Sequence, residues 1–259
     1  PKQSLPNFKF IQADVNKHEE IRSVFSSEHF DYIFHYAAVV GVDRTLAHPL
    51  MVLDDIEGIK NVLNLARITK VKRVFFSSSS EVYGEPLETP QREETTPINA
   101  KLPYAIVKCL AETYLRAYQV EYGIGYIIFR FFNTYGPLQS EDFVIPRFIK
   151  NALRNEDIVL FGDGSQTRTF CYIDDNIDAT EKALENEACI DMVINIGSDV
   201  PVSMIDLAKL VIHASGSKSR IVFVPARVEG EVSSRKPDLS RMKNVLGQKD
   251  SVSLEEGIS

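Results

Sequence analysis

The stretch Arg73-Val74-Phe75-Phe76-Ser77-Ser78-Ser79-Ser80-Glu81 decides the fold class of this chain. Its first part is a short run of β-branched and aromatic residues, which is typical of a strand buried on both faces. Four serines follow directly, where the strand ends. Ligands of α/β proteins bind at the carboxyl ends of parallel strands. The stretch therefore predicts a buried strand that delivers hydroxyl groups to a ligand site, or a serine-rich turn that satisfies its own backbone.

Similar apolar runs alternate with longer helical patterns along the chain. The other expected strands are Phe8–Ala13, Tyr32–Ala37, Tyr126–Phe132, Ile158–Phe161, Val193–Ile196 and Ile221–Val224. The expected helices are His18–Ser27, Pro49–Thr69, Tyr104–Tyr122, Ile145–Asn155, Asp174–Asn186 and Met204–Ala214. This alternation predicts an α/β fold, a doubly wound parallel sheet with helices on both faces.

The character of the sequence changes near Gly136-Pro137, after which loops lengthen and elements shorten. We therefore expect a nucleotide-binding domain over residues 1–136 and a smaller, mainly substrate-binding region over residues 137–259. A ligand then lies between the two regions, at the carboxyl ends of the strands.

Composition excludes several classes of protein. The 259 residues are 44% hydrophobic, and 29 basic against 36 acidic residues give a net charge of −7. These proportions are those of a globular domain, and the acidic balance argues against nucleic-acid binding. No apolar run is long enough to span a membrane. Three cysteines without a metal-binding cluster, and no hydrophobic leader, favour a cytoplasmic protein without a metal site.

Tyr104 and Lys108 have a spacing that carries chemistry, because residues four apart share one face of a helix. A free tyrosine is a poor base near neutral pH. A neighbouring ammonium group favours the phenolate and makes the tyrosine a usable general base. The plainer interpretation is a surface Tyr–Lys pair.

Ser79 followed by Tyr104 and Lys108 resembles the Ser-Tyr-Lys triad of short-chain dehydrogenases/reductases, and in particular their extended branch that modifies nucleotide sugars. The other segments that resemble this branch are His35–Ala38, Arg130–Pro137, Gly162–Asp175, Arg235–Asp238 and Leu254–Gly257. They follow the order of the family and cover essentially the whole chain. The resemblance implies a Rossmann-like fold, NAD as cofactor, a nucleotide-sugar substrate, with UDP favoured, and a homodimer formed through Pro49–Thr69 and Tyr104–Tyr122.

The resemblance also assigns roles. Tyr104 is the base, Lys108 supports it and binds the nicotinamide ribose, and Ser79 orients the sugar hydroxyl, with Ser80 and Glu81 beside it. The residues expected at the cofactor are Asp14, Val15, Ala37, Ala38, Ser77, Tyr104, Lys108 and Phe131. The residues expected at the substrate are Ser79, Asn133, Val144, Leu160, Phe161, Arg168, Arg227, Glu231 and Arg235. Most have a plainer structural alternative, such as a turn for Asp14 or core packing for Leu160.

The family's shared chemistry is oxidation of a sugar at C4 to a transient ketone. We expect 4-epimerisation, because the segment Phe143–Phe148 resembles epimerases. Glu81 and Arg235 resemble residues of UDP-glucuronate decarboxylases, which makes decarboxylation the alternative. A 4,6-dehydratase and a non-catalytic binding protein on the same scaffold follow.

The chain departs from the family pattern at its start. The family opens with a strand, a glycine-rich phosphate loop and a helix, and no glycine pattern here has that spacing. We therefore expect the chain to begin after the family's first βαβ segment, with the glycine-rich loop absent.

Overall fold

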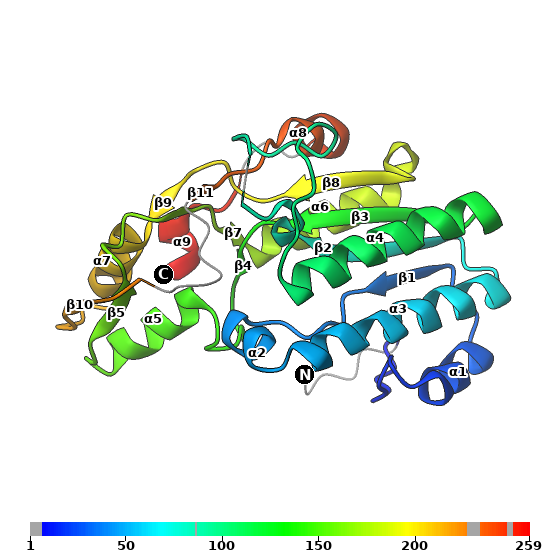
Figure 1. The fold of residues 1–259 in the computed structure, drawn as a ribbon, viewed down its shortest axis with the longest axis horizontal. Coiled ribbons are helices and arrows are strands. Elements are labelled where there is room, and N and C mark those ends of the chain that lie inside the picture. Colours follow the sequence, from blue (N-terminus) through cyan, green and yellow to red (C-terminus); the bar gives the residue numbers. More distant parts are fainter. Residues whose placement is uncertain (1–6, 86, 227–233, 248–250) are drawn as a thin grey trace.

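The core of the fold is a parallel sheet of four strands (Figure 1). The structure is a computed structural model and describes residues 7–85, 87–226, 234–247 and 251–259. The strands stand in the order β1 (Tyr32–His35), β2 (Arg73–Ser79), β3 (Gly125–Phe131) and β8 (Met192–Ile196). All three pairings are parallel, as the apolar runs predict.

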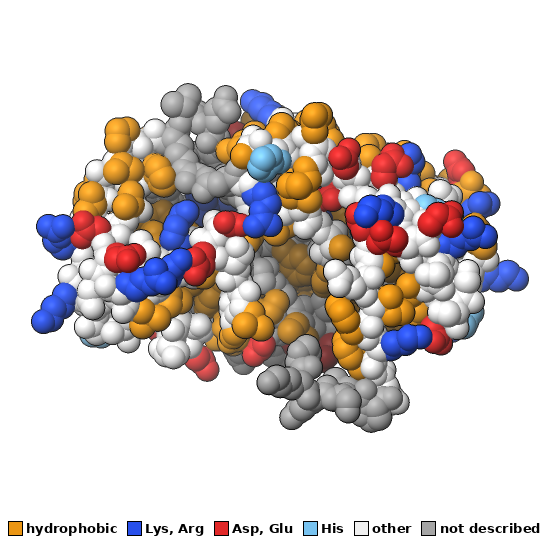
Figure 2. All heavy atoms as spheres, turned by 90° about the horizontal axis from the view of Figure 1, so that it is seen from below, with side chains coloured by type: hydrophobic (Ala, Val, Ile, Leu, Met, Phe, Trp, Pro, Cys, Tyr) orange, Lys and Arg blue, Asp and Glu red, His pale blue; other side chains and the backbone are white. Residues whose placement is uncertain are grey.

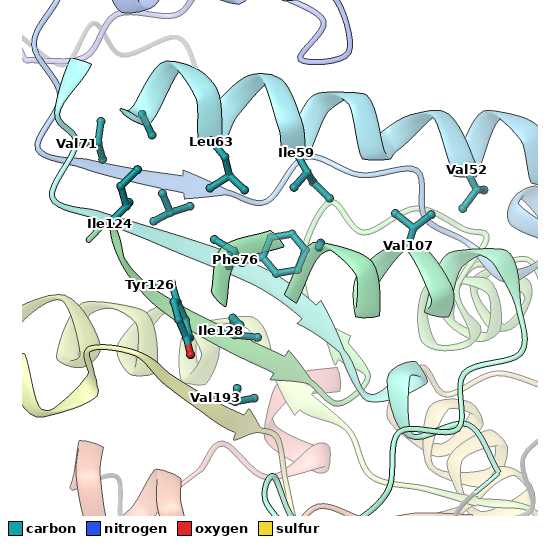
Figure 3. Close-up of a cluster of buried hydrophobic side chains, with 14 residues drawn as sticks. Val52, Ile59, Leu63, Val71, Phe76, Val107, Ile124, Tyr126, Ile128 and Val193 are labelled. Carbon is teal, nitrogen blue, oxygen red and sulfur yellow. The ribbon is translucent and has the colours of Figure 1, made fainter. Parts of the chain in front are cut away.

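Helices cover both faces of this sheet. On one face lie α3 (Pro49–Thr69) and α4 (Pro103–Tyr122), and α1 (His18–Ser27) packs on α3. On the other face lie α6 (Ile173–Glu185) and α8 (Ser240–Leu246). Because strand side chains alternate, Phe76 and Ile128 face α3 and α4, whereas Phe75 and Phe129 face α6 and α8. Figure 3 shows how α3, α4 and the strands meet around Phe76.

A second region is built around its own apolar cluster, to which Phe148, Ile158 and Leu207 belong. Its longer elements are α5 (Val144–Leu153), β5 (Ile158–Phe161), α7 (Met204–Ala214), β10 (Ile221–Val224) and α9 (Leu254–Ile258). Its short strands are β4 (Thr134–Tyr135), β6 (Thr167–Arg168), β7 (Cys171–Tyr172), β9 (Val202–Ser203) and β11 (Ser234–Arg235). Three further short helical pieces are α2 (Val42–Ala47), η1 (Ser80–Tyr83) and η2 (Glu187–Cys189).

The chain returns to the first region after building part of the second. α6, β8 and α8 follow residue 137 in sequence, yet they complete the first sheet and cover it. The first region therefore also contains elements from beyond the predicted boundary at residue 136. The cavity between the regions is still framed by β2, α4 and α5, as expected for an α/β fold.

The predicted elements agree with the structure at most positions. The helices His18–Ser27, Pro49–Thr69 and Met204–Ala214 have the predicted bounds, and the other helices differ by one or two residues at an end. The strand predicted over Phe8–Ala13 is wrong. This segment has no regular structure, and Phe8 and Phe10 are 58% and 75% exposed. A strand needs a backbone partner, and no described strand pairs with this segment.

No helix in the described ranges is both long and apolar enough to cross a bilayer. Charged side chains of both signs are mixed over the face shown in Figure 2. The face is hollowed near its middle, between the two regions.

Candidate active site

A cavity of about 330 Å³ lies between the two regions. Its walls come from the carboxyl end of β2, the first turns of α4, the segment after β1, the turn from β3 to β4 and the start of α5. Sites for small ligands have volumes of roughly 300–1,000 Å³ and combine an apolar lining with a few polar groups. The polar groups here are concentrated where β2 meets α4, which makes that junction the candidate centre of chemistry.

Ser79 and Tyr104 meet at this junction. Ser79 is the last residue of β2, and its hydroxyl accepts a hydrogen bond from the backbone N–H of Glu81 at 3.1 Å, which caps η1. Tyr104 lies in the first turn of α4, where Pro103 suits the helix start because its missing N–H has no helical partner there. Burial raises the pKa of Tyr104 to about 12, and a side-chain hydrogen bond with Ser79 acts in the opposite direction. Without a bound cofactor the phenol therefore keeps its proton at neutral pH.

Lys108 lies one helical turn after Tyr104 and is 3% exposed. Its ammonium group donates a hydrogen bond of 2.6 Å to the backbone carbonyl of Ser77 and lies 5.6 Å from the centre of the Tyr104 ring. Burial lowers the pKa of Lys108 to about 8, although Asp55 raises it in part. The ammonium also lies 4.8 Å from the centre of the Phe76 ring, within the range of a cation–π contact. Lys108 is thus a buried cation that titrates close to physiological pH.

Glu81 and Arg235 form an ion pair beside this centre. Two guanidinium nitrogens of Arg235 donate to the two oxygens of Glu81, the second at 3.3 Å, and Arg235 also donates to the carbonyl of Gly84 at 3.4 Å. Arg235 is buried, whereas the Glu81 side chain is 35% exposed and lines the cavity. The two residues are 154 positions apart in sequence, so only the packing of the second region on η1 brings them together.

The cavity gathers many of the residues that the sequence predicts for the site. Those that line it are Ala38, Ser77, Ser79, Ser80, Glu81, Tyr104, Lys108, Phe131, Asn133 and Val144. Asn133 has a positive φ of 41°, and its amide donates to the Thr169 carbonyl at 2.8 Å, so it also holds the turn after β3.

Other predicted residues lie away from this cavity. Asp14 is exposed, and its carboxylate accepts the backbone N–H of Asn16 at 3.0 Å, which matches the turn interpretation. Val15 packs with the apolar cluster under α1, and Leu160 is in the core of the second region. Ala37, Phe161 and Arg168 do not contribute to the described lining either. Arg227 and Glu231 lie outside the described residues.

The structure adds residues that the sequence did not single out. Asp55 in α3 accepts the backbone N–H of Val39 at 2.7 Å and acts electrostatically on both Tyr104 and Lys108. Gln139 lines the cavity, and within the described part of the chain its buried side-chain carbonyl has no hydrogen-bond partner. Tyr36 and Phe143 contribute aromatic walls. Tyr36 and Phe143 belong to segments that resemble the family, His35–Ala38 and Phe143–Phe148, whereas no local pattern marks Asp55 or Gln139.

Comparison with known proteins decides the family. A sequence model described as the NAD dependent epimerase/dehydratase family matches residues 1–197. This chain belongs to the NAD-dependent epimerase/dehydratase family. The resemblance recognised in the sequence is thereby confirmed, and the family is one of NAD-dependent enzymes.

Three proteins that are similar to this chain illustrate the reactions found among its relatives. A UDP-N-acetyl-alpha-D-glucosaminuronate decarboxylase of Bacillus cytotoxicus is 35% identical over 88% of this chain and 74% of its own. A UDP-glucose 4-epimerase of Thermotoga maritima, solved with UDP-glucose, has a TM-score of 0.90 at 31% identity and covers 99% of this chain and 85% of its own. A UDP-glucuronic acid 4-epimerase of Bacillus cereus, solved with UDP-glucuronic acid and NAD, has a TM-score of 0.86 at 30% identity. The match covers 97% of this chain and 79% of the epimerase.

The cavity of this family member offers polar groups to NAD, the cofactor of the family. The buried ammonium of Lys108 and the phenol of Tyr104 lie side by side at the cavity, and the Gln139 carbonyl supplies an acceptor that has no partner among the described residues. A buried acceptor of this kind is costly unless a ligand or water satisfies it. The described residues contain no cluster of acidic, histidine and cysteine side chains that fits a metal ion.

Proposed function

We propose that this chain modifies a UDP-sugar through a transient 4-keto sugar, and that the reaction is 4-epimerisation. The observation that carries the proposal is the meeting of Ser79, Tyr104 and Lys108 at one end of the cavity. The similar epimerase of Thermotoga maritima was solved with UDP-glucose, and that of Bacillus cereus with UDP-glucuronic acid and NAD, which supports a UDP-sugar as substrate.

Tyr104 and Lys108 divide the work of proton removal. Bound NAD⁺ would supply the acceptor for the hydride of C4 of the sugar, and its reduced form would supply the donor that returns this hydride. The positive charge of the oxidised nicotinamide would add to that of Lys108. Together the two charges would offset the burial that raises the pKa of the Tyr104 phenol. Tyr104 then accepts the proton of the sugar 4-hydroxyl, and Ser79 holds that hydroxyl in place by a hydrogen bond.

Epimerisation needs no further acid or base at the sugar. Tyr104 removes one proton from the 4-hydroxyl and returns it, and the ketone has to present its other face in between. From the family resemblance, we assign to the nucleotide and diphosphate the residues Asn133, Val144, Leu160, Phe161, Arg168, Arg227 and Glu231, and to NAD the residues Asp14, Val15 and Ala37.

Decarboxylation of a UDP-hexuronate is the second candidate, and one observation favours it. Glu81 presents a carboxylate to the cavity while the buried Arg235 holds it from behind. Such a pair is able to move a proton at the carbon that bears the substrate carboxylate, a step that epimerisation does not include. The similar decarboxylase of Bacillus cytotoxicus gives this candidate independent support.

The deciding experiment is proton NMR of the product mixture. The full chain is incubated with NAD⁺ and separately with UDP-glucose, UDP-N-acetylglucosamine and UDP-glucuronate. Inversion at C4 without loss of carbon supports epimerisation, whereas a UDP-pentose from the glucuronate supports decarboxylation. Glu81→Gln is the matched variant: full turnover is expected for an epimerase, and a loss of about 100-fold or more for a decarboxylase that uses Glu81 in proton transfer.

We also propose that the chain forms a homodimer through the outer faces of α3 and α4. Leu53 of α3 and Ile106 and Leu110 of α4 are 40%, 44% and 43% exposed, and the two helices pack against each other, so these side chains are available to an interface. Tyr114, a further apolar residue of α4, packs instead against the core. Light scattering is expected to give twice the monomer mass, and a monomeric mass would contradict the proposal.

The unpaired state of Cys109, Cys171 and Cys189 supports a reducing, cytoplasmic setting.

A further inference from the structure

A buried ion pair lies directly behind the candidate active site. Glu112 of α4 and Arg130 of β3 are each 1% exposed. The guanidinium group donates two parallel hydrogen bonds to the carboxylate, Nε to Oε1 at 3.0 Å and Nη2 to Oε2 at 2.8 Å. This fork-to-fork geometry fixes direction as well as distance.

The pair is hydrogen-bonded to residues on both sides of Ser79–Glu81. The Ser78 hydroxyl donates to Glu112 at 2.7 Å, and the Tyr83 hydroxyl accepts from Arg130 at 2.9 Å. Tyr83 in turn donates to the side-chain carbonyl of Asn195 at 2.8 Å. Ser78 precedes Ser79, Ser80 and Glu81, and Tyr83 follows them, so both ends of the segment are held by the same two charges.

Helix geometry connects the pair to the catalytic residues. Tyr104, Lys108 and Glu112 are spaced by four, so they lie along one stripe of α4. Each of them contacts the end of β2: Tyr104 through Ser79, Lys108 through the Ser77 carbonyl and Glu112 through Ser78. Three consecutive turns of α4 therefore contact three consecutive residues of β2.

Stability alone is a poor explanation for this arrangement. Removing two charges from water is costly, and well-packed apolar pairs often replace buried ion pairs without loss of stability. What an apolar pair lacks is direction, because dispersion contacts tolerate a slide of the helix along the strand. Catalysis does not tolerate such a slide, since a displacement of about 1 Å costs on the order of 100-fold in rate.

We propose that Glu112 and Arg130 are positioning residues, which fix α4 against the end of β2 so that Tyr104 and Lys108 meet Ser79. The expected change in kcat rests on the proposed function. The expected change in backbone position at the end of β2 does not depend on it. The row that contains Arg130 also contains Ser78 and Asn195 as its strand neighbours, so the device spans three strands of the sheet.

The test replaces the charges by an apolar pair of similar size, Glu112→Leu with Arg130→Met. We expect kcat to fall by about 100-fold, with KM changed by less than threefold and the thermal midpoint within a few degrees of wild type. The amide NMR signals of residues 77–81 are expected to shift. The control removes another forked pair, Asp157→Ala with Arg220→Ala, which joins β5 to the start of β10 at 2.9 and 3.1 Å and lies on the surface. It should leave kcat unchanged.

Two milder variants keep the test valid if the double variant does not fold. Arg130→Lys retains the charge but not the fork, and Ser78→Ala removes one hydrogen bond; each is expected to lower kcat by about tenfold. Unmoved amide signals at residues 77–81, or a kcat within threefold of the control, would overturn the proposal. If wild-type protein converts no sugar, the proposed function fails, and the amide signals alone still decide whether the pair positions the segment.

Discussion

The two halves of one sheet face differ in what they do. Toward the amino-terminal ends of β2, β3 and β8, the side chains that face α3 and α4 are apolar, as Phe76, Ile128 and Val193 illustrate (Figure 3). One step further along the same strands and the same face, the row becomes Ser78, Arg130 and Asn195. The first half supplies non-directional burial and the second supplies directional hydrogen bonds.

This difference shows how a fold separates stability from chemistry over a few ångströms. Apolar packing holds the layers together but tolerates small shifts, whereas polar groups at the strand ends fix distances. The active site lies on the directional half, where Tyr104 and Lys108 of α4 contact the end of β2 at Ser79 and Ser77. Substitutions in the two halves should therefore affect different measurements.

Tyr104→Phe is expected to have the largest effect. Loss of the phenol removes the general base, so turnover should fall by about 1,000-fold or more. The thermal midpoint should stay close to that of wild type, because the ring that packs at the start of α4 remains. Turnover assays with the accepted UDP-sugar and thermal unfolding measure the two quantities. Turnover within tenfold of wild type would show that another group is the base.

Ile128→Ala should give the reverse result. Ile128 is fully buried in the apolar half, and loss of three carbon atoms there should destabilise the fold by about 2–5 kcal/mol. Turnover per folded molecule should remain near that of wild type, because no contact of Tyr104 or Lys108 is removed. Urea unfolding and activity measured well below the midpoint test this. A large loss of kcat in the folded fraction would mean that the two halves are not separable.

The pH dependence should sharpen the contrast at Lys108. Burial lowers its pKa from 10.5 to about 8, so above pH 8 the folded protein binds fewer protons than the unfolded chain. Its contribution to stability should therefore rise with pH between about 8 and 10.5. Turnover should fall in the same window, because neutral Lys108 no longer favours the phenolate. Lys108→Met should abolish this opposition, which pH-dependent unfolding and rate profiles would show.

His35 gives a smaller effect of pH on the other side of neutrality. Burial, and then the charge of Lys108, lower its pKa from 6.5 to about 4. The unfolded chain therefore takes up a proton that the folded protein refuses, and stability should be lost as pH falls from about 6.5 to about 4. His35→Phe should flatten the unfolding profile in that range. An unchanged profile would assign the acid sensitivity to other groups.

Local patterns in the sequence determined much of this protein. Alternation of apolar runs and helical periods predicted the parallel sheet and most element bounds, because both periods are set by neighbouring residues. The spacing of Tyr104 and Lys108 placed them on one helix face, and the serines after Phe76 placed hydroxyls at a strand end. Family membership followed from these residues taken together.

Tertiary structure decided what local patterns do not contain. Phe8–Ala13 has the composition of a strand but pairs with no described strand, so composition alone was insufficient. The pairing of Glu81 with Arg235, and of Glu112 with Arg130, joins residues from separate elements. Such contacts depend on which strand and helix ends meet in space, and sequence spacing does not record that. The site's residue types were therefore readable from the sequence, whereas their partners, burial and pKa values came from the packing of the layers.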